Sequence, residues 1–341
     1  MDSRKIANSL LIITLVLMAL YFGKNLLIPF VLGLVAWYLL NAIRKPISRI
    51  KLGSKNIPWW LQWVIAAHIF ALSVGFLGIM VVDNFEEFVE VYPKYHDNIL
   101  AFTESASTDY DLPFSVDEVI HDMDVPTMMT ELLNSSVNLI STISMVIIYV
   151  IFLILEQSIF PKKMRLIFKD KERMESFTET TKKIDESIHS YLSLKTFLCL
   201  ISGVIAYVIL ISIGVDFAIL WAFLIFLFNY IPIIGPFLGV LFPTLIALIQ
   251  FEGYLDAVLV VSLLSTVQLI IGNIIEPKVL GDRLNLSPLT VIVALAFWGS
   301  LWGIAGMFLC VPITVILMII FAQFPATRSA AILLSGGKKE D

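Results

Sequence analysis

The sequence predicts an all-α integral membrane protein with about six full transmembrane helices, two broken or re-entrant helical hairpins and a small acidic external helical segment. The first observation is composition, because 58% of the 341 residues are hydrophobic and only 15% are charged. Soluble domains carry about 25% charged residues. The excess apolar side chains therefore need lipid around them. The same composition argues against a nucleic-acid-binding protein.

The second observation is a set of apolar runs of 17 to 24 residues, close to the length of about 20 residues that crosses a bilayer. These runs cover residues 6–22, 26–43, 59–82, 137–155, 196–213 and 255–275. Backbone groups in lipid must be hydrogen-bonded within their own segment, so each run is expected to be a helix.

The charges predict which loops face the cytoplasm. Residues 44–55 hold five Lys and Arg, and residues 156–195 hold nine. Residues 83–131, by contrast, hold thirteen acidic residues and one lysine. Because basic loops stay in the cytoplasm, we expect the acidic segment outside and both termini inside, in the cell membrane (the inner or plasma membrane).

The acidic external segment, residues 83–136, is expected to be a small helical cap. Within it, Ser115 and Glu118 have the spacing of a capping box. The acidic clusters at 109–111 and 121–124 lack the central glycine and terminal glutamate of an EF-hand loop. We therefore interpret them as a solvated acidic face, and we expect no metal and no cofactor.

The third observation is that two apolar segments are too long for one crossing. Residues 216–250 and 289–321 would each be about 50 Å long as a single helix, against a hydrocarbon core of about 30 Å. Each is interrupted near its middle by residues that break helices. These hinge residues are Pro232, Gly235, Pro236 and Gly239 in the first segment and Gly299, Gly303, Gly306 and Pro312 in the second. Two re-entrant hairpins leave Lys278 and Arg283 inside, whereas the alternative is two kinked spans whose Gly-x-x-x-Gly pairs pack against other helices.

Paired interrupted segments of this kind mark the binding region of many secondary transporters. Between the two segments, polar and small residues recur at spacings of three and four along the helix 255–275, which places them on one face. With a flanking amide and an amide from the first break, they form the candidate substrate path: Asn229, Ser265, Gln268, Asn273 and Glu276. We expect the two breaks to approach each other around this path. The alternative is hydrogen-bonded packing against a neighbouring helix.

Two motifs resemble signatures of the autoinducer-2 exporter (AI-2E) family. They are Asn-Tyr-Ile-Pro-Ile-Ile-Gly-Pro at 229–236 and Ile-Glu-Pro-Lys-Val-Leu-Gly-Asp-Arg-Leu-Asn-Leu-Ser-Pro at 275–288. The resemblance covers nearly the whole chain and is most specific from residue 184 to residue 321. The external segment 83–136 contains no motif that matches the family. The family's motif residues fall here on Pro232, Gly235, Pro236, Glu276, Pro277, Gly281, Pro288, Gly303, Gly306 and Pro312.

The resemblance implies a multi-spanning homo-oligomer, with a pentamer as one candidate, that moves small solutes across the lipid bilayer. Export of autoinducer-2 (AI-2) is the namesake activity of the family, and sodium/proton antiport has also been attributed to members. Most of the matching motif residues shape the backbone. They therefore indicate a mechanism more than a ligand.

With this reading, the chain divides into six segments. Residues 1–82 hold three transmembrane helices, 83–136 the acidic extracytoplasmic segment, 137–155 a transmembrane helix, 156–195 a cytoplasmic amphipathic segment, 196–322 the transport core with both hairpins, and 323–341 a cytoplasmic tail. The two hairpins, 216–250 and 289–321, lie within the transport core.

Three sequence motifs that are typical of enzymes and of nucleotide-driven pumps do not occur. The chain has no G-x-S-x-G, H-E-x-x-H or G-x-x-x-x-G-K-[ST], which argues against an enzyme and against a nucleotide-driven pump. We predict a gradient-driven (secondary) transporter that exports a small polar organic solute similar to AI-2. The alternative is a monovalent cation (sodium)/proton antiporter, for which His68 and Glu276 are the ionisable candidates. A non-transporting membrane scaffold is the third hypothesis.

Overall fold

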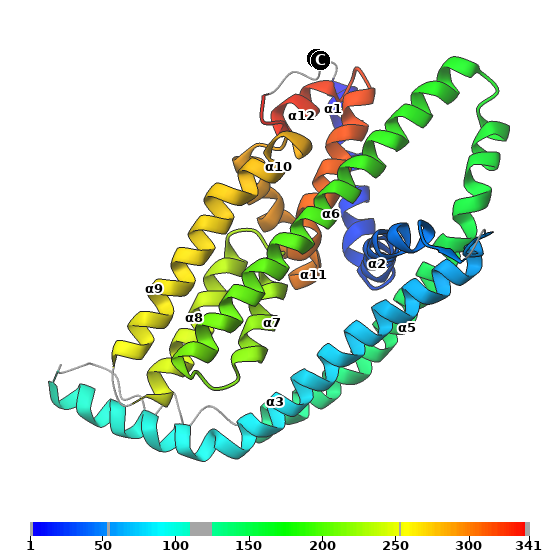
Figure 1. Ribbon diagram of the computed structural model, residues 1–341. Coiled ribbons are helices and arrows are strands. Elements are labelled where there is room, and N and C mark those ends of the chain that lie inside the picture. Colours follow the sequence, from blue (N-terminus) through cyan, green and yellow to red (C-terminus); the bar gives the residue numbers. More distant parts are fainter. Residues whose placement is uncertain (1–2, 53–54, 110–124, 252–253, 338–341) are drawn as a thin grey trace. The chain divides into compact units, whose positions relative to one another are not determined.

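The computed structural model describes residues 3–52, 55–109, 125–251 and 254–337, and these residues are almost entirely helical (Figure 1). The helices are α1 (Ser3–Phe22), α2 (Lys24–Ser48), α3 (Trp59–Asp109), α5 (Val125–Ile167), α6 (Lys171–Ile213), α7 (Ala218–Phe228), α8 (Ile234–Gln250), α9 (Tyr254–Ile270), the π-helix η1 (Ile271–Ile275), α10 (Glu276–Leu284), α11 (Pro288–Gln323) and α12 (Arg328–Leu334). The two-residue strands β1 (Lys51–Leu52) and β2 (Lys55–Asn56) form an antiparallel pair in which Lys51 faces Asn56.

Six helices in the described part of the chain are long and apolar enough to cross a membrane. They cover Lys24–Ser48, Trp59–Asn84, Ser141–Ile167, Lys171–Ile213, Tyr254–Val279 and Pro288–Gln323. Five of them contain or overlap predicted runs, while the predicted run 6–22 lies in α1, whose described apolar part is the shorter Leu10–Phe22. The sixth, α11, is the second overlong segment. The expected all-α, multi-pass membrane architecture is confirmed.

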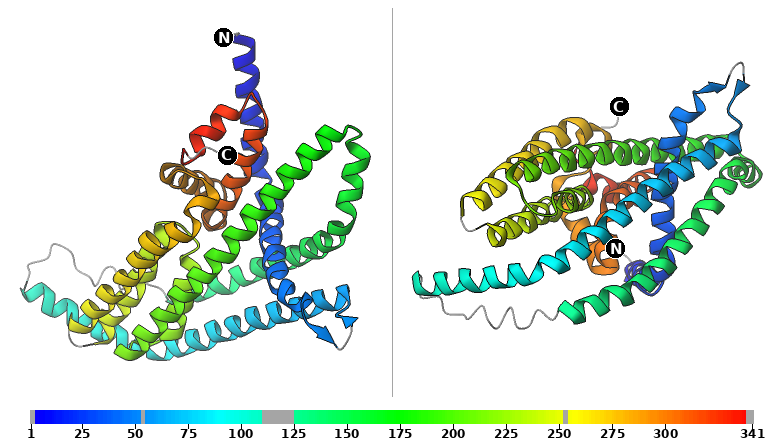
Figure 2. Two further views of the ribbon diagram at one scale, coloured as in Figure 1. Left: turned by 45° about the horizontal axis from the view of Figure 1, so that its top comes forward. Right: turned by 60° about the horizontal axis from the view of Figure 1, so that its bottom comes forward.

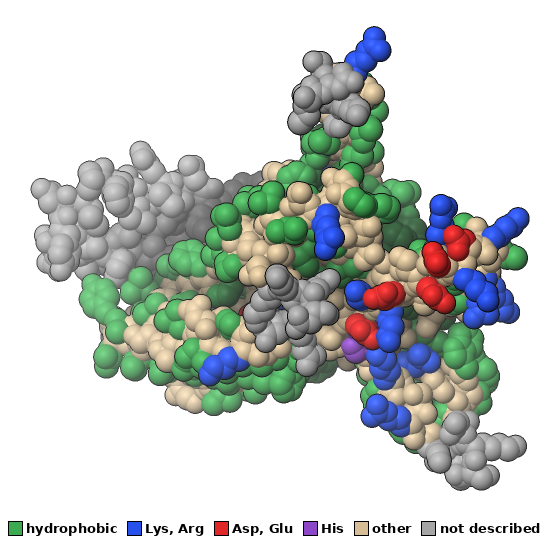
Figure 3. Space-filling view, turned by 90° about the horizontal axis from the view of Figure 1, so that it is seen from above, with side chains coloured by type: hydrophobic (Ala, Val, Ile, Leu, Met, Phe, Trp, Pro, Cys, Tyr) green, Lys and Arg blue, Asp and Glu red, His purple; other side chains and the backbone are tan. Residues whose placement is uncertain are grey.

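Large apolar side chains are exposed along much of these helices and along α1, as contact with lipid requires. Leu11 on α1 is 61% exposed and Leu72 on α3 is 73% exposed. Charged side chains gather instead at the end of α5 and the beginning of α6, where Figure 3 shows Lys and Arg beside Asp and Glu. The separation of apolar and charged surfaces follows the charge pattern of the sequence.

The acidic segment is only partly described. The helix α3 continues to Asp109 and α5 begins at Val125, so both described ends of the segment are helical. The predicted capping box at Ser115 and Glu118 and the acidic clusters at 109–111 and 121–124 lie outside the residues whose side chains are described.

The chain forms two compact units, each assembled from separate stretches of sequence. Unit 1 contains Met1–Gln62, Ser141–Leu194 and Val279–Asp341, and unit 2 contains Trp63–Ile140 and Lys195–Lys278. In unit 2 the hairpin α7–α8 packs beside α9, as the views of Figures 1 and 2 agree. Its apolar core joins α6, α7, α8 and α9 through Ala206, Leu210, Val215, Ile225, Ala247, Ala257, Val260 and Leu264.

The first overlong segment is a helical hairpin in unit 2. The chain leaves α7 at Phe228, turns, and begins α8 at Ile234. The turn is so tight that a Cβ atom at Gly235 would lie 1.8 Å from the carbonyl oxygen of Phe228. Across the arms, the rings of Trp221 and Phe242 stack with their centroids 6.3 Å apart. The predicted interruption therefore reverses the chain rather than merely kinking it.

The second overlong segment, α11, is a hairpin in unit 1. Helical geometry stops at Gly303, which has φ 62° and ψ −141°. The indole Nε1 of Trp298 donates to the hydroxyl of Thr314 at 3.3 Å, although sixteen residues of continuous helix would separate them by about 24 Å. A Cβ atom at Gly306 would lie 1.9 Å from the carbonyl oxygen of Trp298. The chain thus reverses at Gly303, and Pro312 lies within the returning arm.

The hairpin geometry of both segments is therefore clear within each unit. Their entry into and exit from the same side of the bilayer stays a prediction. The two hairpins belong to different units, so their expected approach to each other also stays a prediction.

Candidate functional site

A polar cluster lies inside unit 2, among helices whose other faces are apolar. Lys195 and Ser202 on α6 and Asn229 in the turn after α7 are buried, with 5%, 0% and 6% of their surfaces exposed. Buried polar groups are normally hydrogen-bonded because their desolvation is otherwise uncompensated. The partners of these three residues define the candidate site.

The first part of the site is a chain of neutral hydrogen bonds. Asn229 Nδ2 donates to Ser202 Oγ at 2.7 Å, and Ser202 Oγ donates to Gln268 Oε1 on α9 at 3.4 Å. The other end of the Asn229 amide, Oδ1, is buried and has no hydrogen-bond partner among the described residues. A buried acceptor left in this state costs about 1–3 kcal/mol. The site therefore offers an acceptor to an incoming hydroxyl or water.

The second part of the site is an ion pair. Lys195 Nζ lies 2.5 Å from Glu276 Oε1, and the two side chains are 6% and 29% exposed. Glu276 directly follows η1, and its backbone N–H donates to the carbonyl oxygen of Ile271, five residues earlier. In a continuous α-helix Gln268 and Glu276 would be about 80° out of phase. The wider turn of the π-helix reduces that offset and brings both side chains to one cavity.

The amide chain and the ion pair face the same cavity of about 20 Å³. Its lining residues are Lys195, Leu198, Cys199, Asn229, Pro236, Gln268, Ile271, Gly272 and Glu276. A space of this size accommodates about one water molecule. A larger solute can therefore bind only if the surrounding helices move apart, and the first hairpin supplies two of the lining residues.

The structure brings three of the five residues of the predicted path to this cavity: Asn229, Gln268 and Glu276. Ser265 is half-buried and Asn273 is exposed, and neither lines the cavity. The predicted hinge residue Gly239 faces Gln268, because a Cβ atom there would lie 3.5 Å from Gln268 Nε2. A role of these residues in transport stays a prediction.

The sequence analysis did not single out two residues of the site, Lys195 and Ser202. Lys195 was counted among the basic residues of the cytoplasmic segment 156–195. The available signal was the spacing of Lys195, Cys199 and Ser202, which places polar side chains on one face at the start of an apolar run. A lysine that begins such a face can point inward along the helix, where its charge needs a partner.

His68, the other ionisable candidate of the sequence, lies elsewhere. It is exposed on α3, and its ring Nδ1 is 2.8 Å from the carbonyl oxygen of Val64 on the same helix. It does not line the polar cavity. The structure therefore leaves Glu276 as the better placed of the two.

The outer end of the first hairpin, by the predicted topology, is tied to α3. Tyr95 is buried, and its hydroxyl donates to Asp216 Oδ2 at 2.8 Å. Burial and this carboxylate raise the pKa of Tyr95 above its ordinary value. The backbone N–H of Asp216 donates to Gln250 Oε1 at 2.8 Å, which joins the beginning of the hairpin to its end.

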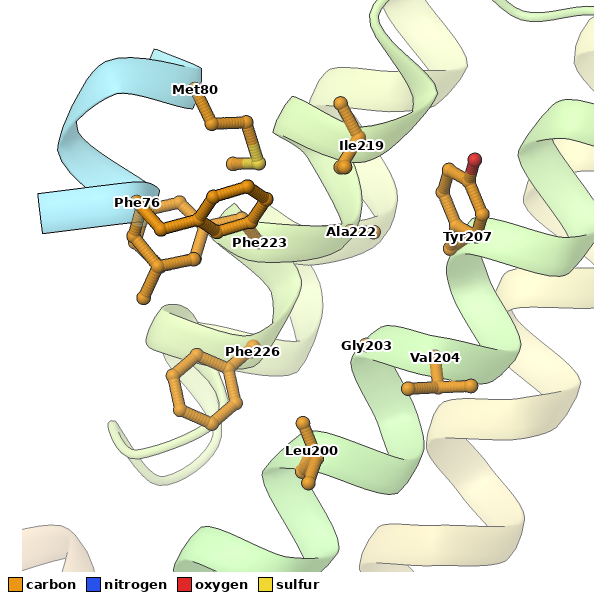
Figure 4. A pocket seen from close by; sticks show the side chains of 11 residues that line it. Phe76, Met80, Leu200, Gly203, Val204, Tyr207, Ile219, Ala222, Phe223 and Phe226 are labelled. Atoms are coloured by element: carbon orange, nitrogen blue, oxygen red, sulfur yellow. The ribbon is translucent and has the colours of Figure 1, made fainter. Parts of the chain in front are cut away.

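Unit 2 also contains a larger pocket of about 390 Å³ between α3, α6 and α7 (Figure 4). Figure 4 shows the side chains of Phe76, Phe223 and Phe226 around it, and Tyr207 carries the one side-chain hydroxyl of its lining. Such a lining offers few hydrogen bonds to a polar solute. The smaller polar cavity is therefore the candidate site.

The comparisons with known proteins agree with this architecture. Residues 10–326 match the model of the AI-2E family transporters. The chain is 31% identical to the AI-2 transport protein TqsA of Escherichia coli K12 over 346 residues, which cover 100% of this chain and 98% of that protein. It is 30% identical to YhhT of the same strain (96% and 89% covered) and 34% identical to a transport protein of Borreliella burgdorferi (72% and 68% covered).

These relatives are named as transport proteins and not as enzymes. The match extends through both hairpins and both signature motifs. The chain belongs to the AI-2E transporter family and is a multi-pass membrane transport protein.

Proposed function

We propose that this protein is a gradient-driven exporter of a small, neutral, oxygen-rich organic solute similar to AI-2. The observation that carries the proposal is Asn229, whose buried Oδ1 has no hydrogen-bond partner among the described residues and which lines a cavity together with Gln268. Amide and hydroxyl groups bind hydroxyl-bearing solutes without requiring a charge on them. The name of the relative TqsA supports the same solute class.

The proposed transport cycle begins from a cavity that is too small for the solute. Solute binding separates the first hairpin from α6 and α9, and the hydroxyls of the solute replace the hydrogen bonds between Asn229, Ser202 and Gln268. The glycines and prolines at the hairpin breaks allow this rearrangement without unfolding the arms. We place the protein in the cell membrane as a homo-oligomer, with a pentamer as one candidate, and with both termini in the cytoplasm.

Solute flux in proteoliposomes tests this function. Vesicles that contain the protein and are loaded with AI-2 should release it faster than protein-free vesicles when a proton gradient is imposed. Replacing Asn229 or Gln268 by Ala should raise the half-saturating AI-2 concentration about fivefold, because each lost hydrogen bond is worth about 1 kcal/mol. Thr266→Ala is the matched control, since Thr266 is exposed on α9 and its hydroxyl donates to the carbonyl oxygen of Ser262 on the same helix.

Equal flux from the parent, both cavity variants and protein-free vesicles would contradict the proposed export. Size-exclusion profiles of the purified variants separate loss of binding from loss of folding.

One observation favours a second candidate, a sodium/proton antiporter. The carboxylate of Glu276 lines the same cavity and is paired with a buried lysine. A carboxylate in such a place can exchange a proton for a cation. In the same vesicles, an outward sodium gradient would then acidify the interior without any organic solute, because each sodium ion that leaves is exchanged for a proton that enters.

A further inference from the structure

The Lys195–Glu276 pair differs from the other ion pairs in the described part of the chain. The exposed pairs on α5, on α6 and in the turn between them are Lys163–Glu156, Arg173–Asp170, Lys182–Glu186 and Lys183–Glu179. Lys195, in contrast, is 6% exposed, and its partner comes from a helix junction 81 residues away in the sequence. This pair also borders a cavity with an unpaired buried acceptor, Asn229 Oδ1.

Stability alone does not explain a buried pair of this kind. Removing two charges from water is costly, and replacing a buried ion pair by apolar residues often leaves a protein equally or more stable. The pair is, moreover, held in place by a π-helix, a form that occurs mostly as single turns and frequently at functional sites. Both features indicate a use for the charges themselves.

We propose that Glu276 is the proton-exchanging group of the transporter and that a proton and the solute compete for it. This inference rests on the proposed function. In the solute-bound state the carboxylate is ionised and accepts a hydrogen bond from a solute hydroxyl, while the Lys195 ammonium donates to a solute oxygen. In the proton-bound state an O–H bond on Glu276 occupies the same carboxylate oxygen. Solute arrival returns that proton to water.

The remaining groups around the pair do not compete for this role. On α6 the neighbouring titratable group is the Cys199 thiol, and in the turn between α7 and α8 it is the Tyr230 hydroxyl, which donates to Thr196 Oγ1 at 2.7 Å. Cysteine and tyrosine ordinarily ionise at pKa values of about 8.5 and 10, above the physiological range. From α8 the lining residue is Pro236, which carries no charge.

The competition between proton and solute for Glu276 determines the net charge of the Lys195–Glu276 pair in each half of the transport cycle. With a neutral solute bound, the ionised pair has no net charge, whereas with a proton bound to Glu276 the pair carries one positive charge. A membrane potential that is negative inside therefore draws the proton-bound state inward. Each solute molecule exported is exchanged for one proton, and export is electrogenic.

The test measures solute binding and proton release together, on the purified full-length protein in weakly buffered detergent solution with AI-2 as the probe. At a pH low enough for Glu276 to be protonated in the solute-free protein, the parent should release about one proton per AI-2 bound. Its AI-2 dissociation constant should then rise about tenfold for each further pH unit of acidification. Glu276→Gln should release no proton and show no pH dependence. Glu276→Asp, which keeps a carboxylate, should retain proton release with weaker binding.

Glu156→Gln is the matched control, because Glu156 is the acidic partner of an exposed pair on α5, and its proton release should equal that of the parent. AI-2 binding without proton release from the parent would overturn the coupling and leave the exporter intact. Proton release caused by sodium but not by AI-2 would overturn the exporter and keep Glu276 as the exchanging group. Unchanged proton release from Glu276→Gln would overturn the assignment of that residue.

Discussion

At the scale of single residues, the account depends on the pairing of a buried lysine, Lys195, with a partly exposed glutamate, Glu276. Lys195 has no other carboxylate at its cavity, since Glu276 is the one acidic residue of the lining. Removing one partner of a buried pair leaves an uncompensated charge and costs about 3–5 kcal/mol, whereas removing both is far less costly.

This asymmetry gives a stability prediction. Lys195→Met should lower the thermal unfolding temperature of the detergent-solubilised protein strongly, and the double variant Lys195→Met/Glu276→Gln should recover most of the loss. Lys163→Met, which breaks the exposed pair with Glu156, should cost less than about 1 kcal/mol. Fluorescence-detected size exclusion after heating gives all three values. A double variant less stable than the single one would show that the pair is not electrostatically isolated.

The sequence predicted these site residues unevenly. Asn229, Gln268 and Glu276 were found because polar residues in an apolar segment at helical spacing indicate a protein-facing stripe. Lys195 was missed because a lysine at the border of a span is normally expected to extend toward water. Its inward direction depends on Glu276, and no spacing rule connects two residues that are 81 positions apart.

At the scale of elements, the hairpin breaks rest on two different properties of glycine. Gly235 is required for space, because its Cβ atom would meet the backbone oxygen of Phe228 at 1.8 Å. Gly303 is required for conformation, because its φ of 62° disfavours a side chain although no atom lies within 4 Å of its Cβ position. The lack of space at Gly235 affects how the arms of the first hairpin pack, whereas the positive φ at Gly303 affects the chain reversal of the second hairpin.

These differences predict different effects of an added side chain. Gly235→Ala should disturb the first hairpin and lower the unfolding temperature markedly, since a backbone atom must move. Gly303→Ala should cost about 1–3 kcal/mol of backbone strain and slow AI-2 flux with a normal size-exclusion profile. Gly78→Ala, at a helical position on α3 with open space around it, is the control and should change neither property. Equal stability of all three variants would argue against the tight turn.

The sequence predicted that both segments are interrupted, because their lengths exceed one crossing. It did not predict which of the glycines and prolines reverses the chain, and in α11 the reversal is at Gly303 rather than at Pro312. The π-helix η1 was not predicted either. No amino-acid pattern distinguishes a π-helical turn from an α-helical one. This turn lies between α9, which keeps its apolar core contacts, and Glu276, which pairs with Lys195.

At the scale of the whole molecule, the two-unit organisation could not be read from the sequence. Each unit joins stretches from distant parts of the chain, and each contains one hairpin. Each predicted segment is a continuous stretch of sequence. Each unit, by contrast, is defined by packing between helices from separate stretches, and no local sequence pattern specifies that packing. The apolar runs, by contrast, were predictable because their length is set by the bilayer.

The topology makes a prediction at this scale. In a background with Cys199 and Cys310 replaced by Ala, a cysteine at Ser107 should react with an impermeant reagent from outside the cell, and one at Ser176 only from inside. The reason is the opposite charge of the segments 83–131 and 156–195. Reaction of both cysteines from the same side would contradict the orientation of the whole chain.

The central claim is that the solute binds in the polar cavity of unit 2, and the native cysteines test it directly. Cys199 lines that cavity, whereas Cys310 is buried in the second hairpin of unit 1. With a small membrane-permeant thiol reagent, saturating AI-2 should slow modification of Cys199 in the Cys310→Ala variant and leave modification of Cys310 in the Cys199→Ala variant unchanged. Transport of AI-2 with no protection of Cys199 would show that the solute takes another path.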